Sequence, residues 1–261
     1  MKIGFVQFSP VFGEKEKNLK QVKNLLKDVS ADLIVLPELF NTGYLFLNKE
    51  ELIKLSEPKD DSKTHDFILN LCKDKNCAIA YGFAEKDGDK IYNSVILMSP
   101  DGIIGHYRKT HLFFEEWFIF TPGNLPYQIY KYKGVKIGML ICFDYIYPEA
   151  MRTIALKGAQ IVLLPANLVL HLCPDAMITR SFENRIFTVL ADRTGIDDRG
   201  IKNLKFIGKS QIVAPNGEVL IRVGDEKCVK IIEIDPNIAL DKKITPHNDI
   251  FKQRRGDLYF H

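Results

Sequence analysis

Residues 135–149 read Val-Lys-Ile-Gly-Met-Leu-Ile-Cys-Phe-Asp-Tyr-Ile-Tyr-Pro-Glu and join a predicted strand to a predicted helix. The apolar run 135–141 predicts a buried strand, and the pattern over Tyr147–Leu156 predicts a helix that closes at Gly158, a typical C-cap residue. Cys142 lies between the two. A thiol there faces the positive end of a helix dipole, which favours the thiolate. Cys142 is therefore a candidate nucleophile, although a buried small hydrophobe is a common role for a free cysteine.

On either side of this stretch, strand-like runs alternate with helical patterns. A hairpin is predicted from Ile91–Met98 to Ile103–Tyr107, because the turn between them contains Pro100 and Asp101-Gly102. The predicted helices are Glu14–Val29, Leu52–Leu55, Thr64–Lys73 and Pro174–Phe187. The other predicted strands are Lys2–Phe8, Leu33–Leu36, Ala78–Tyr81, Ile161–Leu164, Val189–Asp192, Phe206–Val213, Val219–Val223 and Val229–Ile234. Strands that are both sequential and helix-separated indicate a mixed α/β protein with two or more layers.

Length and composition favour one domain over residues 1–261. Of the 261 residues, 46% are hydrophobic, which suffices for a sizeable core. We find no linker-like or low-complexity stretch. Residues 245–261 carry apolar side chains that would be awkward on a free tail, so we expect them to dock on the body or on a partner subunit; these side chains are Ile250, Phe251, Tyr259 and Phe260.

The charge balance and the cysteines narrow the class further. A net charge of +3 with scattered Lys and Arg argues against a nucleic-acid partner. No apolar run approaches the roughly 20 residues that cross a bilayer, so no membrane partner is expected. The five cysteines are odd in number and scattered along the chain, which argues against a disulfide framework and favours a cytoplasmic protein. Cys72 and Cys77 have no Cys or His pair nearby, so a zinc site is poorly supported.

Two more polar residues occupy positions like that of Cys142. Glu38 follows the predicted strand Leu33–Leu36 and a proline, and Lys109 follows a run that ends at Arg108. Because ligands in open α/β sheets bind beyond the carboxyl ends of strands, these side chains are candidates for one site. Each has an ordinary alternative: an ion pair for Glu38, a solvated surface position for Lys109.

Three segments around these residues, together with several shorter motifs, resemble the sequence motifs of a known protein family. They are Leu36-Pro37-Glu38-Leu39-Phe40, Tyr107-Arg108-Lys109-Thr110-His111-Leu112-Phe113 and Ile141-Cys142-Phe143-Asp144-Tyr145-Ile146-Tyr147-Pro148-Glu149. The shorter motifs are Tyr92-Asn93-Ser94, Pro122-Gly123, Leu164-Pro165-Ala166-Asn167 and Glu183-Asn184-Arg185. In this order, across the chain to about Ile234, they resemble the nitrilase superfamily of carbon–nitrogen hydrolases.

The resemblance implies a four-layer α-β-β-α sandwich and a homodimer or larger homo-oligomer. It also implies a Glu-Lys-Cys triad, mapped by motif to Glu38, Lys109 and Cys142. A second family glutamate maps best to Glu116, with Glu115 beside it as the alternative. The implied reaction is hydrolysis of a small amide or N-carbamoyl compound through a Cys142 thioester, with no metal or organic cofactor.

Pocket residues can be suggested only by their proximity to these motifs. Tyr44, Phe143, Tyr145 and Asn167 are candidate substrate-binding residues, although both tyrosines are as readily packing aromatics. His171 and Cys173 follow Asn167 in the chain, but a loop-filling role fits them better. Trp117 is a candidate for the site entrance or a subunit contact. Arg180, Glu183 and Arg185 share one predicted helix, where an internal ion pair is the simpler role.

Rival functions remain. A papain-like Cys-His protease would need His106 or His111 as its base, and its local cysteine signature is absent. A nitrilase acting on a nitrile is the main enzymatic alternative. The non-enzymatic alternative is an interaction module with a silent site, which the intact Glu38, Lys109 and Cys142 argue against.

Overall fold

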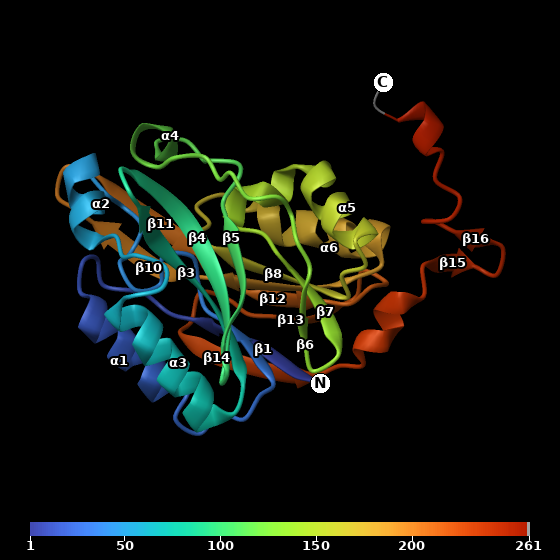
Figure 1. The fold of residues 1–261 in the computed structure, drawn as a ribbon, viewed down its shortest axis with the longest axis horizontal. Coiled ribbons are helices and arrows are strands. Elements are labelled where there is room, and N and C mark those ends of the chain that lie inside the picture. The colour runs from blue at the N-terminus through green and yellow to red at the C-terminus, as the bar shows by residue number, and fades with distance from the viewer. Residues whose placement is uncertain (260–261) are drawn as a thin grey trace.

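The computed structural model, described here for residues 1–259, contains two six-stranded sheets packed face to face (Figure 1). The first sheet has a parallel centre, β1-β2-β3, with antiparallel strands on both sides. Its strand order is β14 (Cys228–Glu233), β1 (Lys2–Gln7), β2 (Leu33–Val35), β3 (Ala78–Asp87), β4 (Lys90–Ser99) and β5 (Gly102–Arg108).

The second sheet repeats this plan, with β7, β8 and β9 parallel at its centre. Its order is β13 (Val219–Arg222), β12 (Gln211–Val213), β9 (Phe187–Asp192), β8 (Ile161–Ala166), β7 (Val135–Met139) and β6 (Tyr130–Tyr132). Strands β1, β2 and β3 of the first sheet contact β8 and β9 of the second, so the two parallel centres lie against each other.

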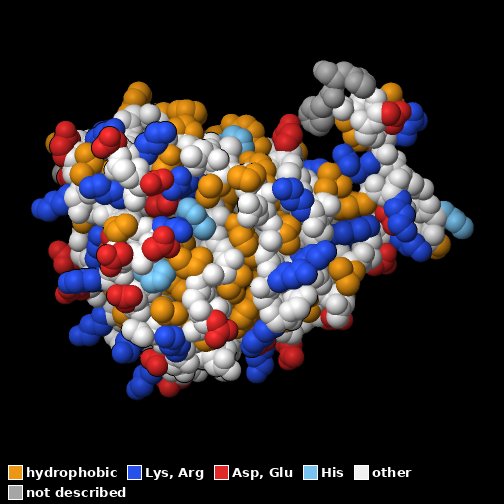
Figure 2. Space-filling model, viewed as in Figure 1, with side chains coloured by type: hydrophobic (Ala, Val, Ile, Leu, Met, Phe, Trp, Pro, Cys, Tyr) orange, Lys and Arg blue, Asp and Glu red, His pale blue; other side chains and the backbone are white. Residues whose placement is uncertain are grey.

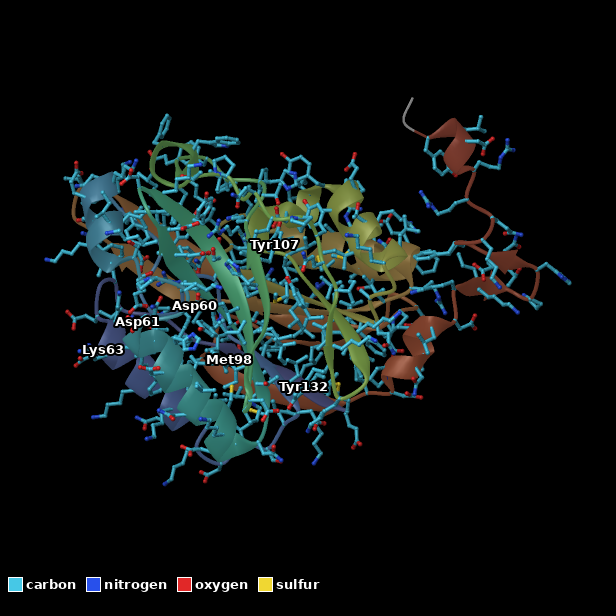
Figure 3. All side chains as sticks on the ribbon, in the orientation of Figure 1. Asp60, Asp61, Lys63, Met98, Tyr107 and Tyr132 are labelled. Carbon is cyan, nitrogen blue, oxygen red and sulfur yellow. The ribbon has the colours of Figure 1, made fainter. Side chains whose placement is uncertain are left out.

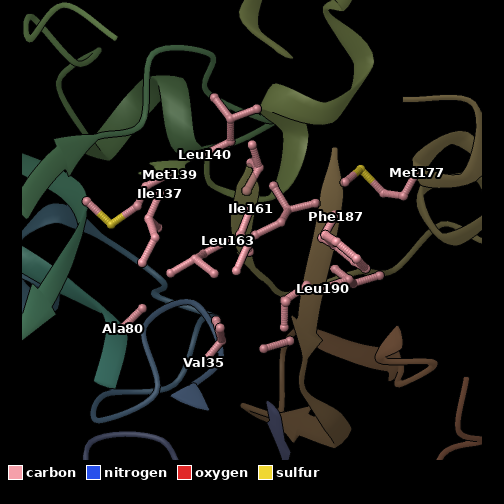
Figure 4. Packing of buried hydrophobic residues seen from close by; sticks show 14 of the residues in the cluster. Val35, Ala80, Ile137, Met139, Leu140, Ile161, Leu163, Met177, Phe187 and Leu190 are labelled. Carbon is pink, nitrogen blue, oxygen red and sulfur yellow. The ribbon is translucent and has the colours of Figure 1, made fainter. Parts of the chain in front are cut away.

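The central strands are buried on both faces, and their residues alternate between two cores. In β2, Leu33 and Val35 belong to the core between the sheets, whereas Ile34 belongs to the core under the outer helices. This follows from the two-residue period of a strand and explains why such strands read as unbroken apolar runs. Figure 4 shows the core between the sheets, where Val35 and Ala80 approach Ile137 and Leu163.

Helices form the two outer layers, so the four-layer sandwich predicted from the resemblance is confirmed (Figure 1). On the first sheet lie α1 (Lys15–Leu25) and α3 (Lys63–Lys75). On the second lie α5 (Pro148–Leu156) and α6 (Leu172–Asn184). The remaining elements near the site are α2 (Lys49–Leu55), α4 (Glu116–Ile119), the 3-10 helix η1 (Cys142–Ile146), and the hairpin β10 (Thr194–Asp198) and β11 (Asn203–Ile207).

Most predicted elements are present, and two differ for local reasons. The predicted strand Phe206–Val213 is two strands, β11 and β12, because Gly208 and Lys209 both adopt positive φ between them. A Cβ at Gly208 would lie 2.7 Å from the Gly224 carbonyl oxygen, so only glycine fits this break. Helix α6 ends at Asn184 instead of Phe187, because Arg185 adopts a left-handed conformation at the C-cap.

The C-terminal segment leaves the body and extends to one side (Figure 1). Phe251 lies under the Arg152 guanidinium, 5.1 Å from ring centre to Cζ, and Lys242 approaches the same ring. Leu258 is 63% exposed. Docking of residues 245–261 on the body or a partner stays a prediction, and its Phe260 lies outside the described residues. The segment contains η2 (Pro236–Leu240), β15 (Lys243–Thr245), β16 (Asn248–Asp249) and η3 (Gly256–Leu258).

Acidic and basic side chains are interspersed over the face of the molecule in Figure 2, as the balanced composition predicts. Within residues 1–259, no helix is long and apolar enough to cross a bilayer.

Candidate active site

The three strand-end residues come together where the carboxyl ends of strands from both sheets meet. Glu38 follows β2, Lys109 directly follows β5, and Cys142 follows β7 after two residues. Figure 3 labels Tyr107 next to this end of β5, and Met98 at the opposite end of β4. All three residues are 5% exposed or less, so their charges interact in a medium with little water.

Lys109 joins two carboxylates. Its Nζ donates to Glu38 Oε1 at 2.7 Å and to Glu116 Oε1 at 2.8 Å, and both partners are buried. Glu116 also accepts from the Tyr44 hydroxyl at 2.7 Å and, through Oε2, from the Phe113 N–H. Glu116 is therefore held from three sides by groups that point at its two oxygens.

Glu115 occupies a different environment. Its carboxylate pairs with Lys202 at 2.7 Å, and both side chains are more than 40% exposed. Of the two adjacent glutamates, the structure therefore places Glu116 against Lys109 and leaves Glu115 at the surface.

Glu38 keeps one oxygen free. Its Oε1 accepts from Lys109 and from Asn93 Nδ2 at 2.6 Å, while Oε2 has no hydrogen-bond partner among the described residues. Asn167 Nδ2 donates to the Glu38 backbone oxygen at 2.9 Å. A Cβ at Gly82 would lie 2.7 Å from the Glu38 Cα, so β3 can approach Glu38 only because this residue is glycine. The free carboxylate oxygen is buried and able to accept a proton.

Cys142 begins η1 with φ of +44°, a conformation that costs free energy outside glycine and is concentrated at functional sites. Asp144 holds this turn. Its Oδ2 accepts from the Ile141 N–H at 3.0 Å and from the Tyr107 hydroxyl at 2.8 Å. Its Oδ1 is 2.7 Å from Nδ1 of His111. His111 thus contacts the supporting acid of the turn, which is not the arrangement of a Cys-His protease.

The pKa of Cys142 contradicts the prediction of a thiolate. Burial and the Glu38 carboxylate raise it well above its ordinary value, and Lys109 and the Asn167 backbone N–H only partly oppose this. The helix dipole contributes little, because Cys142 starts a short 3-10 segment while α5 begins at Pro148. Burial therefore favours the protonated thiol over the thiolate in the absence of substrate.

The two partners of the thiol have shifted pKa values as well. Burial raises the pKa of Glu38, and the attraction of Lys109 does not offset it, because Glu116 adds a second negative charge. Burial acts to lower the pKa of Lys109, but the carboxylates of Glu116 and Glu38 outweigh it and raise that pKa. The cluster therefore combines a firmly charged ammonium with an unusually basic carboxylate.

Two hollows adjoin the cluster. A recess of about 20 Å³ is lined by Cys142 and by the predicted pocket residues Phe143, Tyr145 and Asn167. A larger pocket of about 480 Å³ includes Tyr44 and Glu116 in its wall. All four suggested binding residues thus line one hollow or the other.

Other residues singled out from the sequence lie elsewhere. His171 is exposed, Cys173 is fully buried, and neither lines the recess. Trp117 is 59% exposed on α4 and lines neither hollow. Arg180 pairs with Glu183 three residues on, at 3.1 Å, as the helical spacing predicts.

Three residues that support the cluster were not predicted as site residues: Asn93, Asp144 and Gly82. Asn93 lies in the motif Tyr92-Asn93-Ser94. A side-chain amide inside a largely apolar strand is the signal that could have identified it. Asp144 could have been found as an acid two residues after the candidate nucleophile. Gly82 carries no chemistry of its own and needs the three-dimensional structure. Among residues 1–259, no group of three or more His, Cys, Asp or Glu side chains is arranged to hold a metal ion.

Fold and sequence together define the class. The sequence model of the carbon–nitrogen hydrolase family matches residues 2–242, nearly the whole chain. The protein belongs to this family and is a carbon–nitrogen hydrolase, as the motif resemblance predicted.

Individual relatives agree with this assignment. The chain is 44% identical to a nitrilase of Pyrococcus abyssi, over 100% of this chain and 99% of that protein. It is 33% identical to an (R)-stereoselective amidase of a Pseudomonas species, over 90% and 85% of the two chains. The crystal structure of a carbon–nitrogen hydrolase from Helicobacter pylori G27 has the same fold, with a TM-score of 0.90, 24% identity and coverage of 99% and 97%.

Proposed function

We propose that this hydrolase cleaves a small amide to a carboxylic acid and ammonia or an amine, or an N-carbamoyl compound to an amine, ammonia and carbon dioxide, through a thioester on Cys142. The observation that carries the proposal is the pairing of Lys109 with two buried carboxylates, one of which keeps a free oxygen beside a neutral thiol. Burying Lys109, Glu38 and Glu116 together is costly, because each charge loses its hydration. An ion pair that only stabilised the fold could form at the surface without this cost.

In the first half-reaction, Glu38 takes the Cys142 proton while the sulfur attacks the carbonyl carbon. A neutral thiol requires such a base, and the raised pKa of Glu38 suits it to the task. Lys109 has three N–H donors and uses two on Glu38 and Glu116, which leaves one for the developing oxyanion. The Phe143 N–H is the second expected donor.

The tetrahedral intermediate then collapses to the thioester. Glu38 returns its proton to the departing nitrogen, which leaves as ammonia or an amine. Glu38 next takes a proton from water, the hydroxyl adds to the thioester, and the acid departs as Cys142 regains its proton. Glu116 keeps Lys109 in place through both steps, and no metal or organic cofactor takes part.

Nitrile hydrolysis is the second candidate, because the relative with 44% identity is named a nitrilase. The same cysteine would add to the nitrile carbon, and two waters would be consumed to form the acid and ammonia. Both reactions use the same proton acceptor, so substrate trials must separate them.

The test is ammonia and amine release from a panel of amides, N-carbamoyl amines, ω-amidated dicarboxylates and nitriles. Wild type should turn over at least one amide or N-carbamoyl compound, and Cys142→Ala should be inactive but folded. Cys228→Ala, which removes a half-buried thiol on β14, is the matched control and should keep full activity. Turnover by Cys142→Ala, or turnover of nitriles alone, would contradict the proposal.

We further infer a homodimer or larger homo-oligomer in a reducing, cytoplasmic setting. Apolar side chains on and near α5 and α6 are exposed, among them Ile146 (41%), Leu156 (43%) and Phe182 (42%). All five cysteines are free thiols, which suits a reducing compartment. Light scattering should give a mass of at least two chains, and Phe182→Glu should lower it; a monomeric wild type would refute the inference.

A further inference from the structure

The larger of the two hollows carries information about the substrate. Its volume of about 480 Å³ lies between α4, the loop after β8 and strand β11, elements brought together from distant parts of the chain. Most of its wall is apolar and includes Phe46, Phe113, Ile119, Val169 and Leu204. Ligand pockets of this size bury most of a bound molecule and are commonly lined this way.

This pocket adjoins the recess at Cys142. Phe113 and Val169 line both hollows, so a molecule whose reacting carbon lies at the sulfur can extend past these two side chains. The recess of about 20 Å³ admits only a small group, so it has room for the reacting end of a substrate but not for a long acyl chain. The rest of a larger substrate must therefore occupy the apolar pocket.

The charged residues of the pocket are already paired. Glu116 accepts from Lys109, Tyr44 and the Phe113 N–H, so both of its oxygens are used. Glu115 and Lys202 pair with each other through both carboxylate oxygens, at 2.7 and 2.9 Å. Among the described residues that line the pocket, none offers an unpaired charge to an ammonium or a second carboxylate. A charged substrate tail would thus lose part of its hydration and could gain a partner only by displacing one that is already paired.

We propose that the pocket beside Glu116 binds the acyl chain of the substrate, and that this hydrolase prefers neutral amides with a bulky aliphatic or aromatic acyl group over those with a charged tail. This inference rests on the proposed function, because it takes Cys142 as the reacting atom. Each methylene moved from water into the pocket should raise kcat/KM about threefold to fivefold until the pocket is filled.

The experiment measures kcat/KM for a matched series of primary amides by ammonia release. Acetamide, butyramide and hexanamide vary length; 5-aminovaleramide and glutaramate match hexanamide in size but carry a positive or negative charge. We expect a rise along the neutral series, and a loss of at least about 100-fold for both charged amides relative to hexanamide. A flat series, or a charged amide equal to hexanamide, would overturn the inference.

Substitutions in the pocket wall test whether this pocket determines the preference for neutral over charged amides. Leu204 is partly exposed on β11, and Leu204→Glu should lower kcat/KM for hexanamide at least about tenfold and raise it for 5-aminovaleramide. Ile119→Glu, from α4, should act in the same direction if Leu204→Glu does not fold. Leu220→Glu, on β13 and 37% exposed, is the control and should match wild type. An unchanged ratio of the two substrates in both pocket variants would place the tail elsewhere.

The same data distinguish a failure of the proposed substrate class from a failure of the proposed function. Good turnover of charged or short amides, lost in Cys142→Ala, would leave the proposed function standing and refute only the substrate class. No turnover of any amide would refute this inference, and no turnover of any amide or N-carbamoyl compound would refute the proposed function as well.

Discussion

Arg108 and Lys109 are neighbours in the chain, and each pairs with two carboxylates, yet the central glutamates of the two clusters differ in their hydrogen bonds and in the charge around them. Arg108 pairs with Glu85 and Asp87, and Lys109 with Glu38 and Glu116. Both clusters lie at the end of β5, so the difference between them indicates what would distinguish a structural ion cluster from the one proposed to react.

In the Arg108 cluster, every oxygen of the central acid is used. Glu85 accepts from Arg108 through both oxygens, and its Oε2 also accepts from Ser94 Oγ at 2.5 Å and lies 2.6 Å from His106 Nε2. Burial acts to raise the pKa of Glu85, but hydrogen bonds from His106 and Arg108 lower it to about 2. This carboxylate is stabilised as an anion and is a poor base.

In the Lys109 cluster, the central acid is under-satisfied. Glu38 Oε2 has no partner among the described residues, and the pKa of Glu38 is raised by burial and by the charge of Glu116. Two buried glutamates that each pair with a basic residue therefore have opposite pKa shifts, because the number of hydrogen bonds to the glutamate and the balance of charge around it differ. A buried acid with a free oxygen costs stability and is available for proton transfer.

The largest expected effect is the loss of activity in Glu38→Gln. The amide keeps the shape and the hydrogen bonds of Oε1 but cannot take the thiol proton, so kcat/KM should fall at least about 10³-fold. Because the raised pKa shows that the buried charge is unfavourable, the free energy of unfolding should stay the same or increase. Steady-state kinetics and urea unfolding measure both; activity within tenfold of wild type would exclude Glu38 as the base.

Glu85→Gln should have the opposite profile and serves as the matched control. Removing a charge that three neighbours stabilise should lower the free energy of unfolding by about 3 kcal/mol, from a pKa shift of roughly two units or more. The folded fraction should keep its activity within about threefold, because Glu85 does not contact the reacting groups. Little change in stability together with a large loss of activity would erase the distinction between the clusters.

As the pH rises, Glu85 and Glu38 should change the free energy of unfolding in opposite directions. The pKa of Glu85 is lowered from 4.5, so its stabilising contribution is complete above about pH 4.5 and is lost as the pH falls toward 2. The pKa of Glu38 is raised from 4.5, so its cost is absent below that pH and grows as the pH rises. Urea unfolding from about pH 3 to pH 7 should show the wild-type advantage over Glu85→Gln growing with pH, and that over Glu38→Gln shrinking. Parallel trends for the two variants would contradict this assignment.

The smallest effect is expected for the third kind of ion pair, which is exposed. Glu115 and Lys202 pair in water, so Glu115→Ala should change the free energy of unfolding by less than about 1 kcal/mol. Thermal unfolding compared with Glu85→Gln makes the contrast direct. A loss as large as that of Glu85→Gln would mean that burial is not what separates these pairs.

Much of this architecture could be predicted from the sequence. Strand-end placement singled out Glu38, Lys109 and Cys142, because parallel strands bring their carboxyl ends to one edge of a sheet. The resemblance added Glu116 and the four layers. The hairpin from β4 to β5 followed from its Pro-Asp-Gly turn, and Ser99 does face Gly102 across it.

What could not be predicted depends on contacts between distant segments. Glu115 and Glu116 are adjacent in sequence, and only the fold brings Lys202 to one and Lys109 to the other. The thiolate prediction was wrong, because it weighed a helix dipole without the desolvation of Cys142 and the two acids that surround it. The sequence indicated only that Arg108 ends a strand. Its partners Glu85 and Asp87 lie on β3, so the ion cluster becomes visible only in the fold.

The central claim is that Cys142 carries the acyl group, and trapping that intermediate tests it most directly. Wild type is mixed with an amide that it turns over, quenched in acid within a turnover, and analysed by intact mass and peptide mapping. We predict an added mass equal to the amide minus ammonia, on the peptide that contains Cys142 and absent from Cys142→Ala. Ammonia release without an adduct on Cys142 under conditions where a chemically acylated control survives the quench, or an adduct on another residue, would contradict the account.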